Sequence, residues 1–285
     1  MAILNKIVLA TDLSTASIAA VPVAIGLAKI LKAEVTLLNV FQYVPHHRYQ
    51  VPVGWMVDII RKDVQAKLRQ IKSTFDQAEV PADIVMIEDG VASQQILEFV
   101  DTCKSCILVM GTHAMAGLER FFLGSTAEDV LRSAQCPVVT VGPHVGSTGG
   151  ISQFRKVLFA TDFSVVSLAV LPLALTLRTS ELSSLRVVHV SDEAQADEAA
   201  EYRRFDLIRN ALSSDPFQKK DRIEEYAILP GNDVSREIVR EAERYQADLI
   251  ILGVRRASAF VSHQSPKIAF QVIAASPCAV LTVST

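Results

Sequence analysis

The chain has 285 residues, of which 50% are apolar, and a formal net charge of −3 at pH 7. This length is enough for two ordinary domains, each with its own core. Because no long lysine or arginine block is present, nucleic acid is not an expected partner. No apolar run reaches the ~18 residues that span a bilayer, and residues 1–6 lack the features of an export signal. We therefore expect a cytoplasmic protein with no membrane partner.

The four cysteines also suit a reducing compartment. Two of them, Cys103 and Cys106, form a Cys-x-x-Cys motif where a helix is predicted to end and a strand to begin. A thioredoxin-type pair instead lies at a helix N-terminus, where the helix dipole lowers the thiol pKa. No second Cys-x-x-Cys and no His-x-x-x-His motif is present to complete a zinc site. We expect core or surface thiols and no bound metal.

The first predicted strand and the turn after it occur twice. Residues 6–14 (KIVLATDLS) form a short apolar run that ends in a helix-capping cluster, Asp12 and Ser14. Residues 156–164 (KVLFATDFS) repeat this pattern, and the register holds without a gap as far as a second strand, at 35–40 in the first half. The chain therefore contains an internal duplication.

The later elements follow the same order in both halves. After a loop over 41–55, the first half has an amphipathic helix over 58–77, and the second half has a charged helix over 194–212. The later strands are predicted at 83–90, 106–111 and 136–141 in the first half, and at 185–190, 224–231, 248–253 and 278–283 in the second. The fold class is therefore α/β, with a five-stranded parallel sheet in each half covered by helices on both faces.

A connector rich in glycine and serine separates the halves. We place the first domain at residues 1–143, the linker at 144–153 and the second domain at 154–285.

A loop punctuated by glycines follows the strand at 106–111. Met110 and Gly111 open it, Gly117 lies within it, and Gly124 and Ser125 begin the next predicted helix. Glycines let the main chain approach an oxyanion closely, and the unpaired amides of a helix N-terminus point at bound negative charge. The pattern predicts a phosphate cradle, although similar units also occur in α/β proteins that bind nothing.

Four short segments carry a resemblance to a known family. They are Ala-Thr-Asp after the first strand, Val-Met-Gly-Thr-His before the loop, Gly-Ser-Thr-Ala-Glu at the next helix and Cys-Pro-Val-Val-Thr-Val at the last strand. Over nearly its full length the chain resembles the universal stress proteins in their tandem two-domain form. The resemblance implies two Rossmann-like domains of the adenine nucleotide alpha hydrolase type. In one subgroup of that family, ATP binds through a Gly-x2-Gly-x9-Gly-[Ser/Thr] loop.

The first half nearly matches this loop. Gly111 and Gly124-Ser125 have the family spacing, but Ala114 stands where the family has its second glycine. If that position needs a positive φ, alanine costs on the order of 1 kcal/mol, or about tenfold in affinity, and Gly117 offsets part of the loss. The resemblance implies at most one ATP per chain, with or without Mg²⁺. The residues it assigns to the nucleotide are Ala10, Thr11, Asp12, Val40, Met110, Gly111, His113, Ala114, Gly117, Gly124, Ser125 and Thr126.

Three of these residues have alternative interpretations. By resemblance Asp12 faces the adenosine part and Val40 receives the adenine, both at the carboxyl edge of the sheet, where ligands bind in such folds. Asp12 could instead be a plain helix N-cap, and Val40 a core residue. For His113, a solvated loop histidine is favoured over a phosphate contact.

The second half departs further from the motif. Gly253 is retained, but Arg256 and Pro266 occupy the positions of the second and third glycines, and Lys267 that of the serine. One interpretation is a degenerate domain kept for packing and pairing. The other is that Arg255, Arg256 and Lys267 bind a different anion through their side chains.

The aromatic loop before the first long helix contains His46, His47, Tyr49 and Trp55, which could close over an adenine ring. A flexible surface loop is the favoured interpretation. The motifs G-x4-G-K-[ST] and G-x-S-x-G are missing, and neither first strand is followed by G-x-G-x-x-G. We expect no catalysis.

The expected function is that of a non-enzymatic stress-response protein that binds ATP or a related adenine nucleotide as a regulatory ligand in its first domain. The alternatives are an interaction module that binds no nucleotide and acts through protein surfaces, and a slow ATPase. The last strands, at 137–141 and 279–283, are β-prone edges that need covering. The resemblance implies that they pair into an internal pseudo-dimer, and we also expect two chains to form a homodimer.

Overall fold

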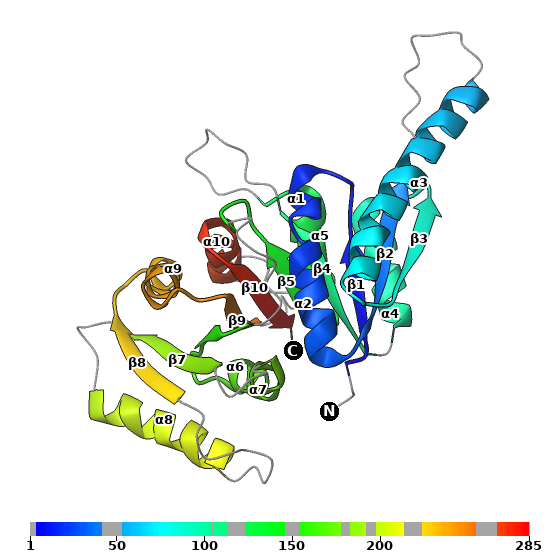
Figure 1. The fold of residues 1–285 in the computed structure, drawn as a ribbon. Coiled ribbons are helices and arrows are strands. Elements are labelled where there is room, and N and C mark those ends of the chain that lie inside the picture. Colours follow the sequence, from blue (N-terminus) through cyan, green and yellow to red (C-terminus); the bar gives the residue numbers. More distant parts are fainter. Residues whose placement is uncertain are drawn as a thin grey trace. The chain divides into compact units, whose positions relative to one another are not determined.

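The structure is a computed structural model, which describes residues 4–41, 53–103, 105–112, 123–145, 154–177, 183–191, 198–213, 224–254 and 267–284. The chain divides into two compact units, of which the first contains strands β1 to β5 and the second β6 to β10 (Figure 1). The predicted α/β fold in two Rossmann-like domains is confirmed, whereas the boundaries at 143 and 154 stay a prediction.

In the first unit, strands and helices alternate along the chain. The elements are β1 (Lys6–Ala10), α1 (Thr15–Ile18), α2 (Val21–Leu31), β2 (Glu34–Phe41), α3 (Val53–Gln77), β3 (Ala82–Glu88), α4 (Ala92–Thr102), β4 (Cys106–Gly111), α5 (Ser125–Ser133) and β5 (Val138–Val141).

The sheet of this unit has the order β3-β2-β1-β4-β5, and all its pairs are parallel. The chain first moves outward from β1 to β3 and then returns to β4 and β5. Right-handed crossovers therefore place α2 and α3 on one face and α4 and α5 on the other. The central strands are apolar and fully buried, as expected of a sheet covered on both sides, and Ile7, Leu9, Ile107 and Val109 have no exposed surface.

One element begins earlier than predicted. Helix α3 starts at Val53 rather than at residue 58, so the predicted loop over 41–55 ends sooner and Trp55 lies on the helix. Trp55 and Ile59 remain more than half exposed, so apolar spacing alone could not have located the helix start.

The second unit repeats the first, with the order β10-β9-β6-β7-β8 and parallel pairs throughout. Its elements are β6 (Lys156–Ala160), α6 (Val165–Leu168), α7 (Leu171–Leu177), β7 (Ser184–Ser191), α8 (Glu198–Ser213), β8 (Glu224–Pro230), α9 (Val234–Tyr245), β9 (Leu249–Val254), α10 (Lys267–Ala275) and β10 (Ala279–Ser284).

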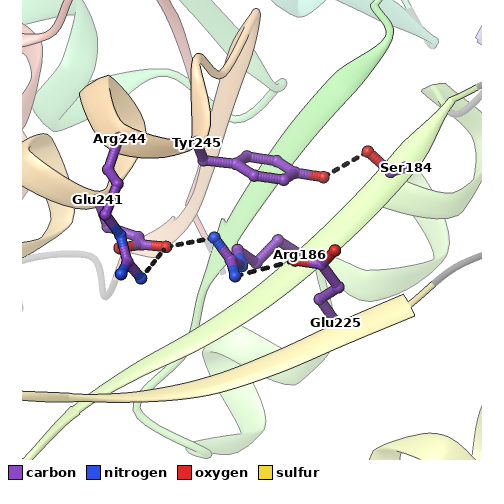
Figure 2. Close-up of polar contacts among 6 residues, drawn as sticks. All are labelled: Ser184, Arg186, Glu225, Glu241, Arg244 and Tyr245. Carbon is purple, nitrogen blue, oxygen red and sulfur yellow. Dashed lines mark hydrogen bonds and ion pairs between the residues drawn. The ribbon is translucent and has the colours of Figure 1, made fainter.

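An ionic cluster joins α9 to the amino ends of β7 and β8 in the second unit (Figure 2). Arg186 donates to Glu241 Oε1 at 2.6 Å and forms an ion pair with Glu225 at 2.9 Å. The Glu241 side chain is 4% exposed and also accepts from Arg244 Nε at 2.8 Å. Both oxygens of the buried carboxylate are therefore paired, which is the condition under which a fold tolerates a buried charge. Tyr245 extends the cluster through its hydroxyl, which hydrogen-bonds to the hydroxyl of Ser184.

Among the helices that the structure describes, none combines the length and the apolar character needed to cross a membrane.

Candidate functional site

A cavity of about 200 Å³ lies at the carboxyl ends of β1, β2 and β4 in the first unit. The amino end of α5 closes its far side. The strand order reverses between β1 and β4, and in open α/β sheets ligands bind in the crevice at such a reversal.

Nine of the twelve residues assigned to the nucleotide by resemblance line this cavity. They come from the ends of three strands and from the first turn of α5. The nine are Ala10, Thr11, Asp12, Val40, Met110, Gly111, Gly124, Ser125 and Thr126. The other three, His113, Ala114 and Gly117, lie outside the described residues, so the effect of Ala114 stays a prediction.

Asp12 stabilises the turn after β1, whereas Ser14 is the N-cap of the helix that follows, α1. Asp12 Oδ1 accepts from the Ser14 amide at 2.9 Å, with Leu13 between them at φ 65°. The Ser14 hydroxyl accepts from the Ser17 amide at 3.2 Å and is the N-cap of α1. The interpretation of Asp12 as the plain N-cap was therefore wrong. Its carboxylate is solvent-exposed and borders the cavity.

Val40 lies near the end of β2. It is half-buried and lines the cavity, whereas Leu38, two residues earlier on the same face of the strand, is 1% exposed. The interpretation of Val40 as a core residue was therefore wrong. Met110 is buried and forms part of the same wall.

Ser17 also lines the cavity, and it was not predicted as a site residue. Its hydroxyl hydrogen-bonds to Thr11 Oγ1 at 2.9 Å, and both side chains are buried. The equivalent Thr161 and Ser167 form the same bond at 2.8 Å. The presence of this pair in both copies of the duplication could have drawn attention to it. The other lining residues that were missed are Leu38, Ala92, Ile96, Thr112 and Ala127.

Gly111 is a glycine for a packing reason. A Cβ at this position would lie 2.1 Å from the Ala16 carbonyl oxygen and 2.7 Å from Ser17 Cα. Gly253 meets the same obstacle in the second unit, where a Cβ would lie 2.5 Å from Ser167 Cα. The close approach of α1 to β4, and of α6 to β9, therefore explains why both halves keep this glycine without any reference to phosphate.

At Gly124, neither a packing contact with the described residues nor the backbone conformation requires a glycine. Gly124 is the N-cap of α5 with φ −58° and ψ 149°, values open to any residue, and a Cβ would meet no atom of the described residues within 4 Å. No side chain caps this helix, and the first amides of α5 have no partner within the helix. This helix start can therefore accept an anion at close range.

The second unit has a larger cavity in the equivalent place, of about 690 Å³. Thr161, Asp162 and Gly253 line it as their counterparts do in the first unit, and Lys267 stands at the start of α10. Burial raises the pKa of Asp162, but hydrogen bonds from Ser164 outweigh it and hold that pKa below its ordinary value. Arg255, Arg256 and Pro266 lie outside the described residues, so binding of a different anion stays a prediction.

Of the four side chains that could close over an adenine ring, the structure describes only Trp55. Trp55 is on α3, 54% exposed, and does not line the cavity of the first unit. His46, His47 and Tyr49 lie outside the described residues.

Comparison with known proteins finds the same family twice along the chain. The model of the universal stress protein family matches residues 4–142 and 153–284. The universal stress protein MJ0531 of Methanocaldococcus jannaschii is 35% identical over 139 residues, which cover 48% of this chain and 81% of that protein. The universal stress protein YxiE of Bacillus subtilis is 27% identical over 154 residues, or 48% of this chain and 98% of its own.

Among solved structures, a universal stress protein from Archaeoglobus fulgidus aligns with both units. The TM-score is 0.77 at 21% identity, and the alignment covers 99% of this chain and 98% of that one. At this identity the likeness concerns the fold alone.

Proposed function

Because the chain belongs to the universal stress protein family, with two tandem domains, we propose that it is a stress-response protein whose first domain binds ATP or a related adenine nucleotide as a regulatory ligand. Binding takes place in the cavity at the carboxyl ends of β1, β2 and β4. We place the protein in the cytoplasm.

The surroundings of Gly124 carry this proposal. A glycine costs conformational entropy, and here neither backbone conformation nor packing requires one. Glycine is tolerated at a helix N-cap, and here it also lets a ligand approach the main chain more closely than a Cβ allows. The exposed start of α5 then offers amides and the Ser125 and Thr126 hydroxyls to a phosphate.

The remaining lining residues fit the other parts of a nucleotide. Val40, Ile96 and Met110 offer an apolar wall to adenine. The Asp12 carboxylate can accept hydrogen bonds from ribose hydroxyls in addition to the bond from Ser14, since each carboxylate has about four lone-pair sites. A cavity of about 200 Å³ is smaller than the ~300–1,000 Å³ of typical ligand sites. The phosphates would therefore extend beyond it, past the start of α5.

The same lining supports binding without catalysis. Asp12 is the one titratable side chain among the described residues that border the cavity. Phosphoryl transfer is catalysed mainly by positioned charges that stabilise the transferring phosphate, and no lysine or arginine is among the described residues that line the cavity. We therefore propose a regulatory ligand rather than a turnover substrate.

Calorimetric titration with ATP and Mg²⁺ tests the site through Gly124→Val. No atom of the described residues lies within 4 Å of a Cβ at this position, so the fold should persist while the phosphate approach is blocked, and affinity should fall at least about tenfold. Lys267→Ala, at the matching helix start of the second unit, is the control and should leave the affinity unchanged. Unchanged binding in Gly124→Val would overturn the proposal. Phosphate release that is lost in Gly124→Val would show a slow ATPase instead.

We further propose that the two domains pair through their last strands into an internal pseudo-dimer and that two chains associate. Within its own unit, β5 pairs with β4, and β10 pairs with β9. Both last strands are apolar and rich in β-branched residues, a composition that suits strand-to-strand pairing.

A further inference from the structure

Three of the four cysteines lie together at the amino ends of β4 and β5. Cys103 follows the last residue of α4, Cys106 is the first residue of β4, and Cys136 precedes β5 by two residues. The Cys103 and Cys106 thiols donate to α4 carbonyls at 3.5 and 3.8 Å. This end of the sheet is opposite to the proposed nucleotide cavity, because parallel strands share one direction.

The strand register brings Cys106 beside Cys136. Leu108 pairs with Val138, and each cysteine precedes its paired residue by two positions. Neighbouring strands lie about 4.8 Å apart, within reach of the ~4.4–6.8 Å between Cα atoms that disulfides span. The register therefore places the two side chains next to each other on neighbouring strands, with Cys106 buried and Cys136 half-buried.

The thiols differ in reactivity. The hydrogen bond from Cys106 lowers the pKa of the Cys136 thiol, and Cys136 is half-buried rather than enclosed. Burial raises the pKa of Cys103, whose side chain is also half-buried. The hydrogen bond to Cys136, followed by burial, raises the pKa of Cys106 well above its usual range. Cys106 is only 2% exposed whereas Cys136 is half-buried, so a peroxide in solution reaches Cys136 first, and Cys136 is the nucleophile of the pair.

We propose that Cys106 and Cys136 are a redox modification site, at which a hydroperoxide oxidises the two thiols to a reversible disulfide. This site is independent of the proposed nucleotide binding.

The chemistry proceeds in two displacements. The Cys136 thiolate attacks a peroxide oxygen, the S–O bond forms, the O–O bond breaks, and hydroxide leaves and takes up a proton to become water. The Cys106 sulfur then attacks the sulfenic sulfur of Cys136, the S–S bond forms, and the S–O bond breaks. The departing hydroxide takes the proton of Cys106. Two thiols lose two electrons, and one hydrogen peroxide becomes two waters.

Cys106 is the resolving thiol because the strand register places it beside Cys136. Among the described residues, no three side chains of the kinds that ligate metals are placed to hold an ion.

The second unit provides an internal control. Cys278 corresponds to Cys136, and Asp248 corresponds to Cys106 in the sheet register, one residue before the Leu249–Ala279 pair. Asp248 Oδ2 accepts from the amides of Arg155 and Lys156 at 2.8 and 2.9 Å. Cys278 is 5% exposed, and burial raises its pKa to about 12. Cys278 therefore has Asp248 instead of a cysteine at the paired position, and its raised pKa keeps it protonated.

The test treats the reduced full chain with a few equivalents of hydrogen peroxide, alkylates the remaining thiols under denaturing conditions and maps the peptides. Four thiols should be alkylated before oxidation and two afterwards, with one Cys106–Cys136 cross-link that dithiothreitol reverses. Cys103→Ser and Cys278→Ser should retain this cross-link. Cys136→Ser should lose it, and Cys106→Ala should instead accumulate a Cys136 sulfenic acid that dimedone traps.

A cross-link between Cys103 and Cys106, or four alkylatable thiols after peroxide, would overturn the proposal. A second measurement needs no variant. Native alkylation of the reduced wild type near pH 7 should modify Cys136 about three- to tenfold faster than Cys103, which is also half-buried, because the thiolate fraction of Cys136 is larger. Equal or reversed rates would contradict the assignment of Cys136 as the nucleophile.

Discussion

Gly111 and Gly124 belong to one loop motif but have different surroundings. The backbone of α1 lies against Gly111, so a Cβ there overlaps the Ala16 carbonyl, whereas a Cβ at Gly124 meets no atom of the described residues within 4 Å. Motif spacing treats the two glycines alike. In this fold Gly111 lets α1 pack closely against β4, whereas Gly124 leaves room beside the start of α5.

This difference predicts opposite sensitivities to alanine. Gly111→Ala should lower the free energy of unfolding by about 1–3 kcal/mol, because backbone atoms must move to admit the methyl group. Gly124→Ala should change it by less than about 1 kcal/mol, because its φ and ψ are open to alanine. Urea unfolding of both variants measures the two effects. A stable Gly111→Ala variant would show that α1 can shift away from β4.

The sequence predicted where some residues of the site lie, but not every hydrogen bond that they form. The ends of β1 and β2 place Asp12 and Val40 at the cavity, as the resemblance implied. The sequence could not show that Ser14 rather than Asp12 caps α1, because both residue types cap helices equally well. It also pointed to the Cys103–Cys106 pair and not to Cys136, because the contact with Cys136 depends on the register of two strands far apart in sequence.

At the scale of elements, α4 and α9 are equivalent helices that begin differently. Asp233 caps α9 by accepting from the Arg236 amide at 3.1 Å, and the Ser235 hydroxyl donates to the same oxygen at 2.7 Å. Val91 holds the same position before α4, with extended backbone angles and no side-chain cap. The Asp233 carboxylate also lies at the positive end of the helix dipole.

Capping predicts effects of opposite sign at these two positions. Asp233→Ala should lower the free energy of unfolding by about 1 kcal/mol, and Val91→Asp should raise it by up to about 1 kcal/mol. The Val91 side chain is 53% exposed, so little packing is lost on replacement. Urea unfolding measures both. A neutral result at both positions would show that capping does not limit the stability of these helices.

The charge of Asp233 adds a dependence on pH. The hydrogen bond from Ser235, followed by that from the Arg236 amide, lowers its pKa below the ordinary 3.8. A carboxyl group whose pKa is lower in the folded state than in the unfolded state stabilises the fold at pH values above its unfolded-state pKa. This stabilisation is lost as the pH falls through the folded-state pKa. Asp233→Asn keeps a cap that does not titrate. The stability advantage of wild type over Asp233→Asn should therefore shrink between about pH 5 and pH 3, and a constant difference would contradict the assignment.

Most elements followed from apolar periodicity and from their repetition in both halves. The predicted strand at 106–111 coincides with β4, and those at 35–40 and 83–90 lie within two residues of β2 and β3. The start of α3 was missed because exposed apolar residues such as Trp55 give no periodic pattern to follow. The ionic cluster around Glu241 was also missed, since its partners come from three separate elements.

At the scale of the whole molecule, the internal duplication was the strongest evidence in the sequence for the fold. One copy of the pattern predicts strands and helices, and two copies in register predict two domains of the same fold. The same comparison shows where the copies have diverged: the cavity of the second unit is larger and has Lys267 where the first has Ser125.

Association of whole chains is measurable by light scattering coupled to size-exclusion chromatography. We expect twice the 31.1 kDa mass of the chain at micromolar concentration. A mass of one chain at all concentrations would show that strand pairing, if present, is confined within the molecule. The measurement should be repeated under reduction, so that an intermolecular disulfide is not mistaken for association.

Native mass spectrometry of the freshly purified full chain tests nucleotide binding most directly, because it counts and weighs bound molecules whatever their identity. We expect one adenine nucleotide per chain, retained in Lys267→Ala and absent from Gly124→Val. A chain free of nucleotide that also stays free after incubation with ATP and Mg²⁺ would contradict the proposal and favour an interaction module that acts through its protein surfaces.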